Sequence, residues 1–122
     1  MLILFVDDDN DDFEMFCEAC QTLDSNIKCV FKHNGAVAVR YLKDAKELPD
    51  YIFLDINMPV MGGVECLKEI KAIDRLRNIP VIIFSTAIDT RTDYKQLGAQ
   101  AVFKKPMRYD ELLKLLHSIL NK

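Results

Sequence analysis

Apolar residues along this chain gather in five short runs, and polar turn residues follow each run. The runs predict strands over residues 2–6, 27–31, 51–54, 81–84 and 101–103. Two of them, "YIFL" and "VIIF", show no alternation of apolar and polar positions. Such runs are typical of strands that are buried on both faces, as in a parallel sheet covered by helices.

Between and after these runs lie stretches whose composition and spacing suit helices. They predict helices over residues 12–23, 35–46, 63–74, 89–97 and 109–120. Because strands and helices alternate throughout, the pattern predicts an α/β fold with a doubly wound, five-stranded parallel sheet. A strand order of 2-1-3-4-5 would place the first strand beside the third, at the switch point of such a sheet.

Length and charge narrow the class of protein. A chain of 122 residues suits one domain with a single fold, and its net charge of −3 argues against a surface for nucleic acid or anionic membranes. No apolar run approaches membrane-spanning length, and "MLILFV" is too short and lacks the basic flank of a signal peptide. We therefore expect a cytoplasmic protein that binds neither nucleic acid nor membrane.

The four cysteines are expected to be packing residues. Cys17 and Cys20 have C-x-x-C spacing, but they lie in the middle of a predicted helix, whereas a redox pair usually opens a helix after a strand. Cys29 and Cys66 do not form a second pair that could complete a zinc site. Free cysteine otherwise behaves as a small hydrophobic residue.

Polar residues that could carry chemistry follow the strands directly. Ligands of an open parallel α/β sheet bind beyond the carboxyl ends of its strands. The candidates there are Asp7 and Asp8 after the first run, Asp55 and Asn57 after the third, Ser85 and Thr86 after the fourth, and Lys104 and Lys105 after the fifth. Converging carboxylates suit Mg²⁺, or Mn²⁺ in its place, and Lys105 would add a further positive charge.

Three more acidic residues, Asp9, Asp11 and Asp12, lie in the same segment, "DDDNDDF". Carboxylates in the first turn of a helix complement its dipole and can cap its free N–H groups, an effect of roughly 0.3–1 kcal/mol each. We therefore expect these three residues to serve the helix that begins here. In the loop after the third strand, Gly62 and Gly63 are expected to supply unusual backbone angles near the site.

Four fragments carry a resemblance to a known family: "FVDDD" after the first strand, "LDINMPVMGG" after the third, "FSTA" after the fourth and "KKP" after the fifth. In this order and spacing, the chain resembles the receiver domain of two-component response regulators, the family of the bacterial chemotaxis regulators. The resemblance implies a flavodoxin-like (βα)5 fold. It also implies a domain that signals rather than acting as an enzyme on other substrates. Because the sequence ends after the fifth predicted helix, we expect a stand-alone receiver domain over residues 1–122, without an output domain.

The resemblance also implies roles for individual residues. Asp55 would accept a phosphoryl group from a histidine kinase or a histidine phosphotransfer protein of a phosphorelay. The other implied roles are Mg²⁺ ligation by Asp7, Asp8, Asp55 and the backbone carbonyl of Asn57, and contact with the phosphoryl group by Thr86 and Lys105. Before phosphorylation, Lys105 would pair with Asp55. A metal, an ammonium and a hydroxyl are the groups that neutralise and orient phosphoryl oxygens.

The chain departs from the family pattern three residues before Lys105, where Val102 replaces the usual tyrosine or phenylalanine. Phe103 follows, but it should point to the opposite face of the strand. A phosphorylation signal would then be carried by other residues. We expect the partner surface over residues 89–107 and the last helix, with Tyr94 and Phe103 as contacts.

Three other interpretations compete with this one. "LFVDDDND" also resembles the nucleophile motif of haloacid-dehalogenase-type phosphatases, with Asp7 as nucleophile and Asp9 as acid, but that fold needs a longer chain and would leave "LDINMP" without a role. A calcium loop over residues 7–18 would carry Asp12 where a glycine is required. A docking module without chemistry gives no reason to place three carboxylates together.

Overall fold

The computed structural model describes residues 1–122, with nine regular elements. The strands are β1 (Leu2–Val6), β2 (Lys28–Lys32), β3 (Tyr51–Leu54), β4 (Val81–Ser85) and β5 (Ala101–Lys104); the helices are α1 (Asn10–Leu23), α2 (Gly35–Asp44), α3 (Gly63–Ala72) and α4 (Tyr109–Leu120). Each strand begins and ends within one residue of its predicted run. The apolar runs therefore located the sheet correctly.

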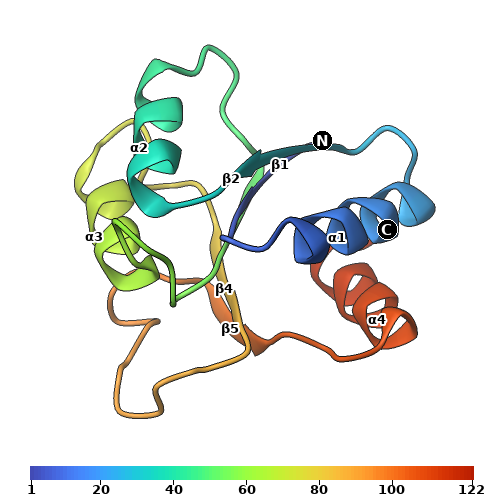
Figure 1. Cartoon of the computed structure of the whole chain (residues 1–122). Helices are drawn as coiled ribbons and strands as arrows, with labels where there is room; N and C mark the ends of the chain where they lie inside the picture. Colours follow the sequence, from blue (N-terminus) through green and yellow to red (C-terminus); the bar gives the residue numbers. More distant parts are fainter.

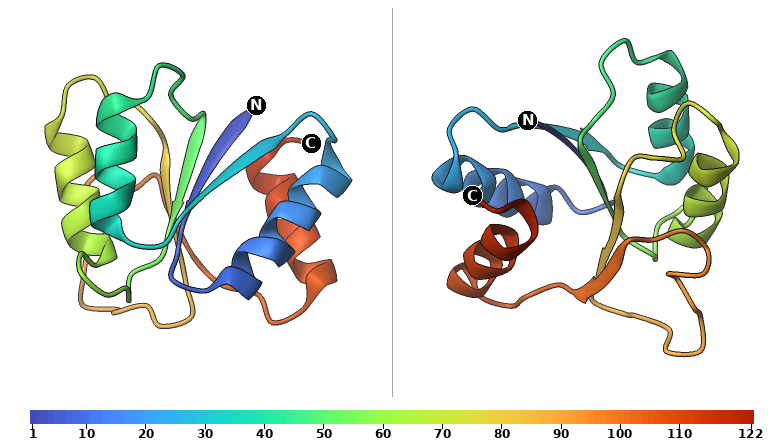
Figure 2. Two further views of the ribbon diagram at one scale, coloured as in Figure 1. Left: turned by 45° about the horizontal axis from the view of Figure 1, so that its top comes forward. Right: turned by 180° about the vertical axis from the view of Figure 1, so that it is seen from behind.

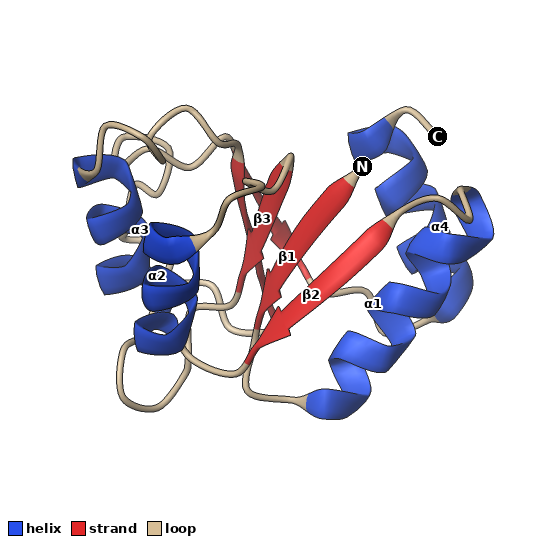
Figure 3. Ribbon diagram, turned by 90° about the horizontal axis from the view of Figure 1, so that it is seen from above, coloured by secondary structure: helices blue, strands red, loops and turns tan.

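All five strands are parallel and form one sheet in the order β2-β1-β3-β4-β5. Helices α1 and α4 cover one face of the sheet, and α2 and α3 cover the other (Figure 1; Figure 2). Seen from above in Figure 3, β1 and β2 point to the same edge between the two helix layers. The predicted fold class and strand order are confirmed. No helix is both long and apolar enough to cross a membrane.

Each face of the sheet has its own apolar core, because successive side chains of a strand point to opposite faces. On the side of α1 and α4, Phe16 packs against Phe5 and Phe53 with ring centroids 4.4 Å and 4.8 Å apart, respectively. On the other side, Leu4 and Ile52 are fully buried beneath α2 and α3. The central strands are therefore buried on both faces, which explains why their sequences do not alternate.

The four cysteines are free thiols, as expected for packing residues. Cys20 and Cys66 are fully buried, one in each core. Burial raises the pKa of Cys66 to about 12 and is the main reason that the pKa of Cys17 is raised to about 11. Both thiols stay protonated at neutral pH and pack as small apolar groups.

The helix predicted over residues 89–97 is wrong: the chain between β4 and β5 forms a series of turns, and the structure has four helices rather than five. The side chains of Asp89 and Asp93 accept hydrogen bonds from the backbone N–H groups of Arg91 at 2.9 Å and Gln96 at 3.1 Å. Aspartates that bond to nearby backbone N–H groups favour turns over continuous helix.

One aromatic residue ties this turn segment to the core. Tyr94 is 3% exposed and packs in the core beneath α2 and α3, and its hydroxyl accepts a hydrogen bond from the N–H of Asp89 at 3.2 Å. Shortly afterwards Gly98 turns the chain with a φ of +113°, which suits glycine. Tyr94 is therefore buried and cannot serve as the surface contact that the sequence predicted.

Candidate functional site

Three carboxylates meet at the carboxyl edge of the sheet. Asp7 and Asp8 follow β1 and Asp55 follows β3, and carboxylate oxygens of the three residues lie within 4.8 Å of one another. Asp7 is 1% exposed and Asp55 is 7% exposed, whereas Asp8 is exposed. The sequence placed these residues after two strands that are neighbours in the sheet, and the sheet brings them together.

The ladder of the sheet fixes the position of both buried carboxylates. The backbone N–H of Asp7 donates to a carbonyl of β2 at 3.1 Å, and that of Asp55 donates to a carbonyl of β1 at 2.9 Å. The Oδ1 atom of Asp7 accepts a hydrogen bond from the N–H of Asp9 at 3.0 Å, and Oδ1 of Asp55 accepts one from the N–H of Ile56 at 2.8 Å. The backbone of each residue is therefore fixed by the sheet, and one oxygen of each carboxylate is fixed by a hydrogen bond from a nearby N–H group.

The chain after β5 brings a cation to these carboxylates. The backbone N–H of Lys105 donates to the carbonyl of Ser85 at 3.0 Å, and the lysine side chain is only 10% exposed. Its Nζ lies 2.5 Å from Oδ2 of Asp7, 2.8 Å from Oδ2 of Asp12 and 3.9 Å from Oδ2 of Asp55. In this structure the near partners of Lys105 are Asp7 and Asp12, and Asp55 lies at longer range.

Burial and charge perturb the two groups of the closest pair. Burial raises the pKa of Asp7 to about 6, although Lys105 opposes the change, and the nearby Asp55 raises it further. Burial lowers the pKa of Lys105, but the adjacent carboxylates of Asp12 and Asp7 outweigh burial, so its pKa is raised overall. Lys105 therefore stays protonated at neutral pH. Ionisation of the buried Asp7 is energetically unfavourable unless a further positive charge lies nearby.

A divalent cation fits this donor set. Oδ2 of Asp7 is buried and accepts no hydrogen bond, although Lys105 lies beside it. Carboxylate oxygens from Asp7, Asp8 and Asp55 are hard ligands of the kind that Mg²⁺ and Mn²⁺ take in proteins, and the exposed Asp8 leaves room for metal-bound water. A metal ion here would offset the charge that burial makes costly.

The remaining acidic residues of the segment divide into two kinds. Asp9 is the N-cap of α1, and its Oδ1 accepts hydrogen bonds from the N–H groups of Asp11 at 2.9 Å and Asp12 at 3.3 Å. The capping role expected of Asp9 is confirmed, and Asp11 is exposed in the first turn. For Asp12 the expectation was incomplete, because its carboxylate bonds to Lys105, which lies 93 residues further along the chain.

The helical period could have identified Asp12. Phe16 and Ala19, four and seven residues later, are both fully buried against the sheet. Asp12 therefore begins the stripe of α1 that faces the sheet, whereas Asp11 points to solvent. The same helix start at Asn10 excludes the calcium loop considered over residues 7–18, since most of that stretch is helical.

The two other candidate residues, Asn57 and Thr86, are exposed in the loops that follow β3 and β4. Neither side chain makes a hydrogen bond to the three carboxylates. Ser85, directly before Thr86, is 1% exposed, and its hydroxyl accepts a hydrogen bond from the N–H of Ala87 at 3.4 Å. Thr86 thus follows β4 at the same edge of the sheet, but its hydroxyl makes no hydrogen bond to Asp55.

The loop between β3 and α3 needs glycine for a different reason from the one expected. The left-handed residue in this loop is Val60, with a φ of +68°, and neither Gly62 nor Gly63 has a positive φ. A Cβ at Gly63 would instead overlap the backbone carbonyl of Asp55. The prediction of unusual glycine angles is therefore wrong, and the role of Gly63 is to let α3 begin close to the candidate site.

The two residues before Lys104 point to opposite faces of β5, as the sequence predicted. Val102 packs against the core beneath α2 and α3, the same core that holds Tyr94. Phe103 packs against the core beneath α1 and α4 and is only partly exposed. The chain therefore has a small side chain, Val102, at the position where the family usually has an aromatic residue. The same core holds a buried aromatic ring, Tyr94, from the turn segment.

Comparison with known proteins agrees with this geometry. The family model of the response regulator receiver domain matches residues 3–117. The chemotaxis protein CheY of Bacillus subtilis is 37% identical over 91 residues, which cover 72% of this chain and 72% of that protein. Sporulation initiation phosphotransferase F of the same organism is 44% identical over 69 residues, which cover 55% of this chain and 54% of that protein.

Solved structures show the same fold. The phosphorylated cyanobacterial phytochrome response regulator RcpA matches with a TM-score of 0.88 and 28% identity, covering 97% of this chain and 89% of that chain. A response regulator in its Mn²⁺-bound form matches with a TM-score of 0.85 and 26% identity, covering 97% of this chain and 90% of that chain.

The chain belongs to the response regulator receiver domain family. Receiver domains are signalling domains of two-component systems; they bind a divalent metal ion and are phosphorylated by histidine kinases or phosphotransfer proteins. The resemblance noted from the sequence is confirmed. The phosphatase alternative, with Asp7 as nucleophile, gains no support from the strand order or from the family match.

Proposed function

We propose that this protein is a response-regulator receiver whose Asp55 accepts a phosphoryl group in an Mg²⁺-dependent reaction. The observation that carries the proposal is the meeting of Asp7, Asp8 and Asp55 beside Lys105 at the carboxyl edge of the sheet. Three acidic groups and one largely buried cation form a site that favours a metal ion together with an anionic phosphoryl group.

Asp55 is the proposed nucleophile because its two oxygens differ. Oδ1 accepts the hydrogen bond from Ile56, whereas Oδ2 accepts no hydrogen bond and faces Lys105 at 3.9 Å. An attack by Oδ2 on phosphorus would form the acyl phosphate as the bond from phosphorus to the donor's histidine nitrogen or acetyl oxygen breaks. Asp7, Asp8 and the carbonyl of Asn57 would hold Mg²⁺, which supplies charge neutralisation for the phosphoryl oxygens.

The exposed hydroxyl of Thr86 would donate a hydrogen bond to the phosphoryl group, and Lys105 would pair with it. Lys105 stays protonated at neutral pH, since Asp12 and Asp7 raise its pKa against the effect of burial. Phosphoryl transfer depends mainly on such positioning and neutralisation of oxygens. Thr86 makes no hydrogen bond to Asp55 in this structure, so we expect the loop after β4 to shift toward the phosphoryl group.

The output of the domain would pass to a partner protein that contacts β5, the loop after it and α4. Phe103, Lys104 and Met107 line a surface hollow there together with Glu111 and Leu115 of α4. Met107 is 94% exposed, which is unusual for a large apolar side chain. With Tyr94 buried, Phe103 and Met107 are the apolar contacts that we propose for the partner.

The proposal is tested by phosphorylation with a small donor. Incubation with acetyl phosphate and Mg²⁺ should add one phosphoryl group, detected as a mass increase that is lost in base. Asp55→Asn should abolish it, whereas Asp44→Asn, at the exposed end of α2, should not. Omission of Mg²⁺ should also prevent it. Persistent phosphorylation of Asp55→Asn would contradict the proposal.

A further inference from the structure

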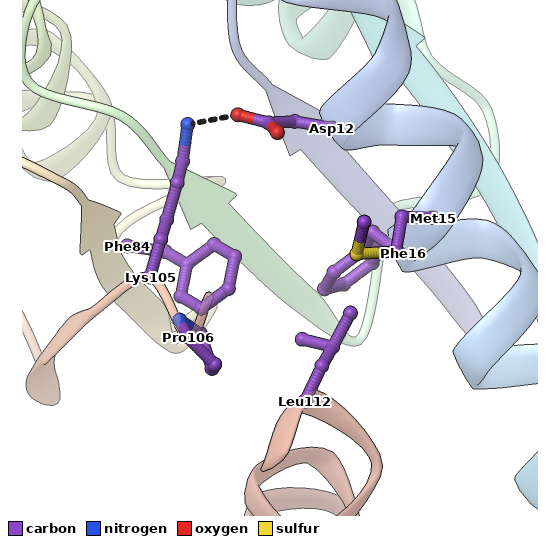
Figure 4. A pocket seen from close by; sticks show the side chains of 7 residues that line it. All are labelled: Asp12, Met15, Phe16, Phe84, Lys105, Pro106 and Leu112. Carbon is purple, nitrogen blue, oxygen red and sulfur yellow. Dashed lines mark hydrogen bonds and ion pairs between the residues drawn. The ribbon is translucent and has the colours of Figure 1, made fainter. Parts of the chain in front are cut away.

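Lys105 lies beside Asp7 of the proposed site, but its hydrogen bond goes to Asp12, which lies outside the three carboxylates. Figure 4 shows its side chain extending beside Phe84 toward α1, where Nζ meets the carboxylate of Asp12. This contact is a hydrogen bond of 2.8 Å. The distance of 3.9 Å from Nζ to Oδ2 of Asp55 is beyond hydrogen-bonding range.

The surroundings of the contact distinguish it from an ordinary surface ion pair. The Lys105 side chain is 10% exposed and that of Asp12 is 37% exposed. Beneath the pair lies a small cavity of about 20 Å³, and its apolar lining residues are Met15, Phe16, Phe84, Pro106 and Leu112. Reduced solvent and apolar walls strengthen a charge pair relative to one in open water.

Two acidic groups can therefore compete for the Lys105 ammonium group: Asp12 and a phosphorylated Asp55. From its present place Nζ lies 2.5 Å from Oδ2 of Asp7 and 2.8 Å from Oδ2 of Asp12, but 3.9 Å from Oδ2 of Asp55, so it is hydrogen-bonded on the α1 side and not to Asp55. A phosphoryl group on Asp55 would add charge and acceptor oxygens on that side. A shift of Nζ away from Asp12 toward those oxygens would lengthen or break the bond of 2.8 Å to Asp12.

We propose that Asp12 is a positioning residue: it holds Lys105 in the resting position and competes with the phosphoryl group for it. This inference rests on the proposed function of Asp55. The competition means that the strength of the bond between Asp12 and Lys105 sets how readily the phosphorylated form gains its lysine contact. Removing the charge of Asp12 would therefore favour the phosphoryl-bound position of Lys105.

The test compares Asp12→Asn with Asp11→Asn, using beryllofluoride with Mg²⁺ as the phosphoryl mimic. Each substitution removes one negative charge from the first turn of α1, so effects of net charge and of the helix dipole are common to both variants. Of these two aspartates, Asp12 forms an ion pair with Lys105 and Asp11 does not. Dissociation constants are taken from backbone amide shifts in NMR titrations, and melting curves establish that each variant is folded.

Asp12→Asn should bind beryllofluoride about two- to five-fold more tightly than Asp11→Asn, the range expected for loss of one partly exposed ion-pair competitor. The difference should disappear when both substitutions are made in a Lys105→Met background. Without ligand, the NMR signals of the Lys105 ε-methylene group should shift in Asp12→Asn and stay in place in Asp11→Asn. A merely structural role in α1 would not move those signals.

Equal dissociation constants for the two variants, weaker binding by Asp12→Asn, or a difference that survives in Lys105→Met would each overturn the competition. These results differ from a failure of the proposed function. Wild-type protein that does not bind beryllofluoride at all would overturn the proposed function and the competition with it. Wild-type binding with equal constants for the two variants would overturn the role of Asp12 alone.

Discussion

The two sides of the candidate site are built in different ways. At the ends of β1 and β3, the sheet ladder continues through the backbone N–H groups of Asp7 and Asp55, and both side chains are buried. After β4 the chain leaves the sheet, Thr86 is exposed, and the segment over residues 86–100 consists of turns closed by its own aspartates. One side depends on long-range contacts and the other mainly on local ones.

This difference separates the chemistry of the site from its response. The carboxylates are held in place by the central strands, so their positions should change little when a ligand binds. In the segment 86–100 only Tyr94 and Ala99 are buried. Regions with few buried apolar contacts open at a lower free energy than the core, and they are the ones that can repack when a ligand binds.

The largest effect is expected from Tyr94→Ala, which removes the main anchor of the turn segment. Loss of a buried aromatic ring should lower the free energy of unfolding by about 3 kcal/mol. Urea denaturation followed by circular dichroism measures the change. A cost below about 1 kcal/mol would show that the segment opens independently of the core and that Tyr94 does not tie it to the sheet.

Asp7→Asn should stabilise the metal-free protein by about 2 kcal/mol at pH 7, because it removes a buried charge. The pKa of Asp7 is about 6 in the folded protein, above the ordinary value of 3.8, so the folded state binds the proton more readily than the unfolded chain. The stability that protonation contributes is present at low pH and is lost as the pH rises from about 4 through about 6.

Thermal melts without metal at several pH values check this prediction. The wild type should lose stability as the pH rises through this window, and Asp7→Asn should lack that part of the pH dependence. The charged groups near Asp7 are Lys105, Asp55 and Asp8, with Asp12 bound to the same lysine, and Lys105 stays charged throughout. A destabilised Asp7→Asn variant with an unchanged pH profile would contradict the electrostatic cost assigned to this carboxylate.

Mg²⁺ should stabilise the carboxylate side of the site by mass action. At ten times its dissociation constant it should add about 1.4 kcal/mol to the free energy of unfolding. Asp8→Asn should remove most of this response, whereas Asp11→Asn, in the exposed first turn of α1, should keep it. A response that survives Asp8→Asn and disappears with Asp11→Asn would show that Mg²⁺ binds at the first turn of α1 and would contradict the assignment of Asp8 as a ligand.

The smallest effect is expected from Tyr94→Phe, which keeps the ring and removes only the hydrogen bond to the N–H of Asp89. The cost should be about 1 kcal/mol. Amide hydrogen exchange should become faster in the segment 86–100 and stay unchanged in β1 and β3. Equal acceleration in the central strands would mean that the two sides of the site are not energetically separate.

The sequence was sufficient to predict the sheet, because buried strands such as β3 and β4 consist of nearly continuous apolar residues. It was also sufficient to bring Asp7 and Asp55 together, since the ends of neighbouring parallel strands meet at one edge. The segment 89–97 was predicted wrongly for a local reason: Asp89 and Asp93 form turns with nearby backbone groups, and this competition outweighs a weak helical pattern.

The pairing of Lys105 with Asp12 could not be predicted from the spacing of residues along the sequence. Asp12 lies 93 residues from Lys105, and the contact depends on the angle at which α1 crosses the sheet. The stripe shared with Phe16 indicates which acidic residue faces inward, but it does not say which cation meets it. The burial of Tyr94 was missed for a similar reason, because a single aromatic residue in a polar segment suits a surface contact as well as an anchor.

The most direct test of the site is to locate the phosphoryl group itself. After treatment with acetyl phosphate and Mg²⁺, borohydride reduction converts an aspartyl phosphate to homoserine, and tandem mass spectrometry of the peptides identifies the residue that has changed. The geometry at the ends of β1 and β3 predicts homoserine at position 55 and unmodified aspartate at position 7. Homoserine at position 7 would contradict the assignment of Asp55 and support the phosphatase alternative.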